Sequence, residues 1–329
     1  MKYVAKIGPG VLLCLVLAIP AWFIGNQIPV IGCPVLGILF GMLLALWKRP
    51  GVFQAGVTYS SKKLLQYSII LLGFGMNLFV VFEVGSQTIV LMLFTLTATF
   101  LTAYLCGKVL KVEKNTNILI GVGTAICGGS AIAATAPVIQ ADDEEVARAI
   151  STIFLFNVIA AFLFPALGHL LHLNDVQFGL WAGTAVNDTS SVVAAGYTFS
   201  DAAGNLAVIV KLTRTLMIIP ITLGLALYTS RKKTHTGASA YPISKIFPFF
   251  IVGFVVASVI RTFTPMPTEL SMGLVELGKF MIVMAMAGIG LHTNLVKLVQ
   301  NGWKPILLGL ICWAVLSLTA LLVQFCLIG

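Results

Sequence analysis

The sequence predicts an all-α, polytopic membrane protein of about 11 transmembrane helices, with inverted repeats and two discontinuous helices. Of its 329 residues, 59% are hydrophobic and 9% are charged, and the mean hydropathy of +1.03 lies well outside the soluble range. Apolar stretches of about 20 residues, the length that crosses a bilayer, follow one another along the whole chain. Because almost nothing remains for a soluble domain, we expect a single transmembrane domain over residues 1–329.

Short polar loops separate the apolar stretches. These stretches lie near residues 7–24, 29–47, 64–83, 87–107, 117–139, 148–171, 177–198, 205–228, 244–261, 270–296 and 304–328. Lys2 and Lys6 precede the first stretch, which also fits the start of a signal peptide. Pro20 is unfavourable before a cleavage site, however, and the second stretch follows at once, so we expect the first stretch to remain as a span.

Basic residues are concentrated in the short loops. The net charge of +9 therefore predicts topology, through the excess of Lys and Arg on the cytoplasmic side, and does not indicate nucleic acid as a partner. This excess places the N-terminus in the cytoplasm. The acidic segment 142–145 lies outside the cell if every stretch spans, and inside if residues 117–139 and 177–198 are re-entrant. Both topologies remain open.

No catalytic or metal-binding motif is recognisable in the sequence. The six cysteines all lie within apolar segments and lack metal-ligand spacing. No segment follows the Walker A, Rossmann or zincin patterns. We therefore expect neither an enzyme nor a metal or other cofactor.

Two similar segments interrupt the apolar stretches sixty residues apart. Gly-Thr-Ala-Ile-Cys-Gly-Gly-Ser-Ala-Ile covers Gly123 to Ile132, and Gly-Thr-Ala-Val-Asn-Asp-Thr-Ser-Ser-Val covers Gly183 to Val192. An unpaired backbone group is costly in lipid, so broken helices persist only where they are buried in protein or line a wet cavity. Secondary transporters build central substrate sites from such helices.

A second pair of similar segments lies farther apart. One runs from Leu72 to Leu78 as Leu-Gly-Phe-Gly-Met-Asn-Leu, and the other runs from Ala287 to Leu295 as Ala-Gly-Ile-Gly-Leu-His-Thr-Asn-Leu. A Pro-led span precedes each one, and the two pairs of spans enter the membrane from opposite sides, which predicts an inverted repeat. The polar residues of these segments are site candidates, namely Asn77, His292 and Asn294. Gly-x-Gly alone would also permit close helix packing, and His292 either couples protons or forms a structural hydrogen bond.

Lys211, Arg214 and Asp188 lie well inside predicted spans, where ionisable side chains usually have a function. Lys211 and Arg214 lie roughly 9 and 14 Å into their span at about 1.5 Å per residue. Their spacing of three places them on one helix face. Alternatively, the span begins later and both side chains reach the interface. Asp188 is a counter-ion, a proton carrier, a cation ligand or one half of a structural ion pair. With two cations against one anion, the cavity favours an anionic substrate.

The two Gly-Thr-Ala segments also supply neutral hydrogen-bond donors. Helix halves that begin near Gly128 and Thr189 would direct N–H groups and a positive dipole end into the site. Hydroxyl groups beside them can donate to oxyanions without adding charge. The residues that we assign to the substrate site in these segments are Cys127, Gly128, Gly129, Ser130, Asn187, Asp188, Thr189, Ser190 and Ser191.

Three segments resemble the YeiH-like sulfate exporter family of bacterial membrane proteins. They are Gly123 to Ile132, Gly183 to Gly196 and Ala285-Met-Ala-Gly-Ile-Gly-Leu291. The resemblance covers nearly the whole chain and implies a bacterial inner-membrane protein that exports sulfate or sulfite. The family usually has His before the Asp of the second motif, whereas this chain has Asn187. The broken helices also resemble the sodium/proton antiporter and bile acid symporter folds, an analogy that names no substrate.

The sequence thus favours a secondary active transporter, an exporter of small inorganic oxyanions of the sulfate or sulfite class, working by alternating access. Lys211 and Arg214 would attract the anion, and Asp188 would compensate charge or bind a coupling proton or sodium ion. The alternative is a sodium/proton-type cation antiporter that uses Asp188, with Asn187 and Asn77 beside it. A membrane sensor or scaffold has less support. Besides the anion, we expect membrane lipid as a partner and a homodimer as the assembly.

Overall fold

The computed structural model describes residues 2–27, 33–46, 50–218, 220–222, 224–225, 249–293 and 302–327. These residues form helices, with no β-strand among them. Six described helices are long and apolar enough to cross a membrane, and they cover Lys6–Gln27, Leu78–Val109, Glu144–Leu170, Asp201–Thr222, Thr268–His292 and Trp303–Cys326. Three shorter apolar helices cover Cys33–Ala45, Gly129–Ile139 and Phe249–Phe263. The prediction of a polytopic all-α membrane protein is therefore confirmed at this level.

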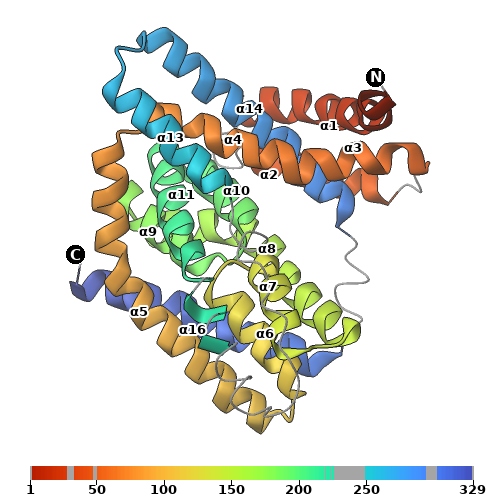
Figure 1. Ribbon diagram of the computed structural model, residues 1–329, viewed down its shortest axis with the longest axis vertical. Coiled ribbons are helices and arrows are strands. Elements are labelled where there is room, and N and C mark those ends of the chain that lie inside the picture. The colour runs from red at the N-terminus through yellow and green to blue at the C-terminus, as the bar shows by residue number, and fades with distance from the viewer. Residues whose placement is uncertain are drawn as a thin grey trace.

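The helices form two groups that lie one above the other in Figure 1. The scaffold group contains α1 (Lys2–Gln27), α2 (Cys33–Ala45), α3 (Gln54–Tyr59), α4 (Leu65–Leu72), α13 (Phe249–Phe263) and α14 (Thr268–His292). The hairpin group contains α5 (Leu78–Val109), α6 (Lys114–Ala125), α7 (Gly129–Ile139), α8 (Asp143–Leu170), α9 (Asp175–Ala185), α10 (Thr189–Phe199), α11 (Asp201–Leu216) and α16 (Trp303–Leu327). An apolar cluster that includes Ile38 of α2, Val193 of α10 and Met286 of α14 joins the two groups.

The Gly-x-Gly segments serve helix packing in the scaffold group. Gly41 of α2 and Gly290 of α14 approach each other so closely that a Cβ atom on either would collide with the backbone of the other helix. A Cβ atom on Gly73 would meet the Phe254 carbonyl oxygen of α13 at 2.5 Å. Small residues allow this separation because the backbones themselves make the contact.

Two predicted spans have different boundaries in the structure. The predicted stretches 64–83 and 87–107 meet in α5, which runs without interruption from Leu78 to Val109. Asn77 ends the preceding helical segment and caps α5, because its side-chain oxygen accepts a hydrogen bond from the Phe79 N–H at 2.8 Å.

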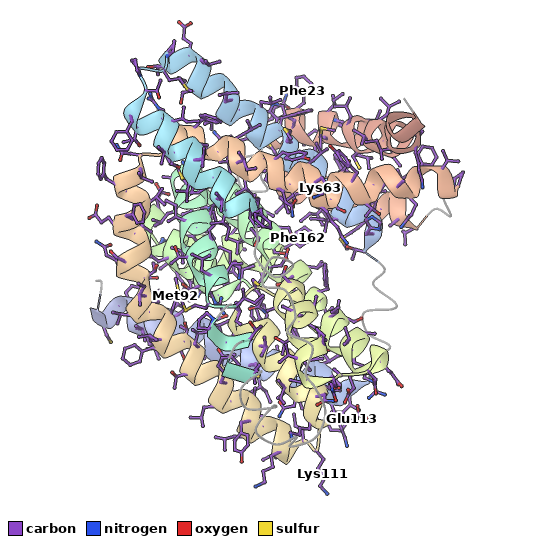
Figure 2. The ribbon with its side chains drawn as sticks, in the orientation of Figure 1. Phe23, Lys63, Met92, Lys111, Glu113 and Phe162 are labelled. Atoms are coloured by element: carbon purple, nitrogen blue, oxygen red, sulfur yellow. The ribbon has the colours of Figure 1, made fainter. Side chains whose placement is uncertain are left out.

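Helices α6 and α7 form a hairpin. The start of α6 lies beside the start of α8, since Asn115 Nδ2 donates to Glu145 Oε2 at 2.9 Å and Arg148 Nη1 lies 2.7 Å from Glu113 Oε2. Helix α8 follows α7 after a short turn. The beginning of α6 and the end of α7 therefore share one end of the molecule, which we name the first end and which Lys111 and Glu113 mark in Figure 2.

Helices α9 and α10 form a second hairpin, which enters from the opposite end. Ser200, which follows α10, donates from its Oγ to Oδ1 of Asp175 in the first turn of α9 at 2.5 Å. Helix α8, 28 residues long, connects the two hairpins. A hairpin followed by a long helix thus occurs twice with opposite direction, as α6–α8 and α9–α11.

The hairpins agree with the second of the two topologies left open for residues 117–139 and 177–198, in which each segment turns back on itself. The acidic segment 142–145 lies at the first end, beside the start of α6. The Gly-Thr-Ala segments form their two turns and mark an inverted repeat with an offset of sixty residues. An inverted repeat places equivalent residues near its pseudo-two-fold axis.

Candidate functional site

The turns of the two hairpins lie against each other in the interior of the hairpin group. The first turn contains Cys127 and Gly128, and the second contains Asn187 and Asp188. A Cβ atom placed on Gly128 would lie 3.5 Å from the Cβ atom of Asp188. Gly128 has φ +69° and ψ −130°, a conformation that L side chains rarely adopt. The sequence prediction that the two segments form one site is consistent with this contact.

Lys211 of α11 binds backbone carbonyl groups at both hairpin turns. Its Nζ donates to Ile126 O at 2.9 Å and to Val186 O at 3.0 Å. These carbonyl groups lie at the C-terminal ends of α6 and α9, where carbonyl groups lack helical partners and the helix dipole is negative. The Lys211 side chain is fully buried.

Arg214, one turn further along α11, makes the same kind of contact. Its guanidinium donates to Ala125 O and Thr124 O, both at 2.7 Å, and also to Thr184 O. The side chain is fully buried. Because the hydrogen bonds of both cations end on backbone carbonyls, Lys211 and Arg214 can attract an anion through their charge, without touching it.

The N-terminal ends of α7 and α10 differ from each other. Asp188 caps α10, since its Oδ2 accepts hydrogen bonds from the Ser190 N–H at 2.9 Å and from the Ser190 hydroxyl group. Gly128 holds the equivalent position of α7 and provides no side-chain cap. Gly129 is half-buried and Ser130 is exposed. A helix N-terminus without a side-chain cap can bind an anion through its N–H groups.

Asn157 of α8 is a site residue that the sequence analysis missed. Its Oδ1 accepts a hydrogen bond from the Asp188 N–H at 3.1 Å. Its Nδ2 has no hydrogen-bond partner among the described residues and lies 3.5 Å from the position of a Cβ atom on Gly128. The side chain is 2% exposed. A polar residue in the middle of the apolar stretch 148–171 was the available signal.

Further buried polar atoms surround the two turns. The Oδ1 and Nδ2 atoms of Asn187 and the hydroxyl groups of Thr124 and Thr184 have no partner among the described residues. Asn187 is 1% exposed, and Cys127 in the other turn is also buried. Buried polar groups usually have hydrogen-bond partners, so unpartnered ones at one place indicate a site for a ligand or water. Thr189 is half-buried, and Ser191 is buried within α10.

Three predicted site residues do not join this site. Asn77 is exposed and caps α5 beside Thr262 of the scaffold group. His292 lies at the end of α14, where its ring nitrogens contact Gln54 Nε2 at 3.5 Å and Thr58 Oγ1 at 3.2 Å. The structure does not bring these two predicted site residues to the hairpin turns, because their segments pack within the scaffold. Asn294 lies outside the described residues.

A cavity of about 360 Å³ opens between the two helix groups at the opposite end. Its lining includes Trp22, Thr198 and Lys279. Lys279 of α14 lies 2.7 Å from Asp201 of α11 and 2.9 Å from Glu276. The first of these ion pairs joins the scaffold group to the hairpin group.

The sequence matches, over residues 9–309, a family described as conserved hypothetical protein 698. Similar proteins carry the name UPF0324 membrane protein. The chain belongs to this family. A UPF0324 membrane protein of Streptococcus pyogenes serotype M6 is 51% identical over 326 residues, covering 96% of each chain. UPF0324 membrane proteins of Streptococcus mutans and Fusobacterium nucleatum are 47% and 46% identical, again over 96% of each chain.

The UPF0324 name describes a membrane protein and gives no activity. No solved structure matches the chain. The chemistry of the site must therefore be inferred from its own residues. In this UPF0324 protein, two buried cations neutralise two helix C-termini, and one uncapped helix N-terminus lies beside a carboxylate and an unpartnered amide group.

Proposed function

We propose that the protein is a secondary active transporter that exports small inorganic oxyanions of the sulfate or sulfite class by alternating access. Inverted repeats with re-entrant helices and a site near the pseudo-two-fold axis are typical of secondary transporters. The membrane setting of the UPF0324 family agrees with this proposal. An excess of basic loop residues favours a cytoplasmic N-terminus in a bacterial inner membrane.

The observation that carries the proposal is the pairing of Lys211 and Arg214 with the carbonyl ends of α6 and α9. Four helix ends meet at the two turns, and their dipoles would cancel if none were capped. Because the two cations neutralise the negative ends, the positive ends of α7 and α10 dominate. Asp188 offsets one cation, so the centre keeps a positive charge that suits an anion.

Alternating access requires the hairpin group to move against the scaffold group. The surfaces between the groups support this motion, because the buried side chains of α10 that join the apolar cluster are Val193 and Ala194, which are short. The substrate site itself lies wholly within the hairpin group, formed by α6–α11. The anion would thus travel with that group.

Uptake of radiolabelled sulfate and sulfite into proteoliposomes tests the function. The purified protein is reconstituted, and a proton or sodium gradient is applied in turn. We expect saturable anion flux that one gradient accelerates. Vesicles with the protein that take up no more of either anion than protein-free vesicles, under any gradient, would refute oxyanion transport.

A sodium/proton-type cation antiporter is the second candidate, favoured by the carboxylate of Asp188 at the turn of the second hairpin. Both of its described hydrogen bonds end on Oδ2, so Oδ1 can accept a proton or bind a cation. The Asp188→Asn variant separates the two functions. It should abolish cation exchange in an antiporter, whereas an oxyanion transporter keeps flux with altered coupling or selectivity.

A further inference from the structure

The two hairpin turns are related by the repeat, yet they offer an oxyanion opposite hydrogen-bonding groups. At the start of α7, the Gly129 and Ser130 N–H groups and Asn157 Nδ2 are donors. At the equivalent place in the second hairpin, Asp188 Oδ1 is an acceptor. A Cβ atom on Gly128 would lie 3.5 Å from both Asn157 Nδ2 and Asp188 Cβ, so the donor side and the acceptor side lie next to each other.

The buried amide of Asn157 is held in a fixed orientation. Its Oδ1 accepts from the Asp188 N–H at 3.1 Å, which directs Nδ2 toward the uncapped end of α7. The side chain is 2% exposed, and Nδ2 has no partner among the described residues. A buried N–H₂ group without an acceptor is unfavourable, and an anion oxygen would supply that acceptor.

A fully ionised dianion fits this site poorly. The buried cations donate to backbone carbonyls of both hairpins and have no described contact with the space beside Gly128. The carboxylate of Asp188 would repel a dianion and receive no hydrogen bond from it. An oxyanion that carries one O–H group can donate this hydrogen to Asp188 and still present its other oxygens to Asn157 and α7.

From this arrangement we infer that the site selects a protonated oxyanion, a hydrogensulfite-type monoanion, over a fully ionised dianion such as sulfate. The inference rests on the proposed function and specifies its substrate class. Asn157 and the N-terminus of α7 bind the charged oxygens, and Asp188 accepts the O–H hydrogen. Sites that hydrogen-bond a substrate hydroxyl strongly reject analogues that lack it, because a buried group is left unpaired.

The ionisable groups that face Asp188 come from two elements. Lys211 lies on α11, and Cys127 lies in the first hairpin turn. Asn157 faces it from α8 and does not titrate.

Equilibrium binding to the purified full-length protein tests the inference, with radiolabelled sulfite as the probe and sulfate as the competitor. Hydrogensulfite loses its proton between mildly acidic and mildly alkaline pH, whereas sulfate is a dianion throughout this range. We expect sulfite affinity to fall as the pH rises, and sulfate to compete at least tenfold more weakly than sulfite at the acidic pH. Equal competition by sulfate, or sulfite affinity that is independent of pH, would overturn the inference.

Two variants and a matched control test which residues determine the selectivity between sulfite and sulfate. Asn157→Asp keeps the oxygen that accepts from the Asp188 N–H but replaces the Nδ2 donor. It should weaken sulfite binding by about tenfold to hundredfold, because one hydrogen bond to a charged group contributes that much affinity. Asn205→Asp is the control, since it adds the same charge while keeping the oxygen that accepts from the Tyr197 hydroxyl group at 2.6 Å. Asp188→Asn should reduce sulfite affinity and raise sulfate affinity.

The outcomes separate the inference from the proposed function. Two results would refute the selectivity for a protonated anion and leave the proposed transport function intact. One is that the wild-type protein transports sulfate as well as sulfite. The other is that Asn157→Asp binds sulfite as tightly as Asn205→Asp. If the wild-type protein neither binds nor transports either anion, the proposed function falls and the inference falls with it. The pH and competition measurements need no variant, so misfolding of a variant cannot hide the result.

Discussion

Two buried cations on one turn of α11 are the residues on which the site depends. Lys211 and Arg214 together bind five backbone carbonyl oxygens, drawn from both hairpins. A buried charge is tolerated only when it is paired or hydrogen-bonded. Here the partners are buried carbonyl groups at the C-terminal ends of α6 and α9, so the cations and the carbonyl groups compensate each other's cost of burial.

Arg214→Ala should therefore destabilise the protein. The substitution leaves three buried carbonyl groups without a donor, which costs roughly 3 kcal/mol or more at about 1 to 3 kcal/mol for each group. We expect a marked fall in the thermal unfolding midpoint of the detergent-solubilised protein. Arg148→Ala, at a side chain that is 29% exposed and pairs with surface carboxylates, is the control and should change stability by less than about 1 kcal/mol. Equal midpoints for both variants would contradict the structural role of Arg214.

Gly128 and Gly129 are adjacent glycines with different conformational demands. Gly128→Ala places a Cβ atom at φ +69° and should cost about 1–3 kcal/mol. Gly129→Ala adds a Cβ atom within a helix, at an ordinary 3.5 Å from Phe154, and should be tolerated. Thermal unfolding of the two variants compares them directly. A greater loss of stability for Gly129→Ala would contradict the assigned turn.

Among the helices, the two hairpins define the architecture. Each contains two helices of 11 or 12 residues, too short to span a bilayer alone. Asn115 of α6 ties the open end of the first hairpin to Glu145 of α8, and Ser200 joins the two arms of the second hairpin through Asp175. Their turns consequently lie inside the hairpin group and line the site from opposite ends of the molecule.

Cysteine accessibility tests the hairpins, in a background where the six native cysteines are replaced. Lys108→Cys and Ala141→Cys flank the first hairpin, and a membrane-impermeant thiol reagent should reach both from the same face of the membrane. Val176→Cys and Ala202→Cys flank the second hairpin and should react from the other face. Labelling of Lys108→Cys and Ala141→Cys from opposite faces would show that residues 117–139 cross the membrane.

The sequence predicted the helical breaks well and their geometry only partly. Small polar runs at Gly123 and Gly183 located both turns, because such runs are costly inside lipid. Hydropathy does not show whether the chain turns back, so a hairpin and a broken span give the same apolar pattern. Asn77 and His292 were misplaced because a polar residue beside Gly-x-Gly also fits a helix end. Asn157 stands alone in an apolar helix, and no motif drew attention to it.

For the molecule as a whole, the boundary between the scaffold and hairpin groups is the surface on which alternating access would act. An apolar cluster lies at this boundary, and Lys279 of α14 pairs across it with Asp201 at 2.7 Å. Lys279 is 17% exposed and Asp201 is 66% exposed. A partly exposed pair of this kind contributes about 1 kcal/mol or less to stability, so it can break during a transport cycle.

A reversible link across this boundary tests the motion. Lys279→Cys combined with Asp201→Cys, in the cysteine-free background, positions two thiols for a short bifunctional reagent. We expect the linked protein to lose anion flux and to regain it when a reducible link is cleaved. Each single-cysteine variant, treated in the same way, is the control. Full flux through the linked protein would contradict relative motion of the two groups.

The most direct test of the central claim, that an oxyanion binds where the two hairpins meet, is a diffraction experiment on the protein crystallised with selenite. Selenium scatters anomalously, so its position can be determined independently of the protein. We predict one strong anomalous peak within hydrogen-bonding range of the Gly129 N–H, Asn157 Nδ2 and Asp188 Oδ1. A peak elsewhere, with no density at the hairpin turns under conditions where selenite inhibits transport, would contradict the account.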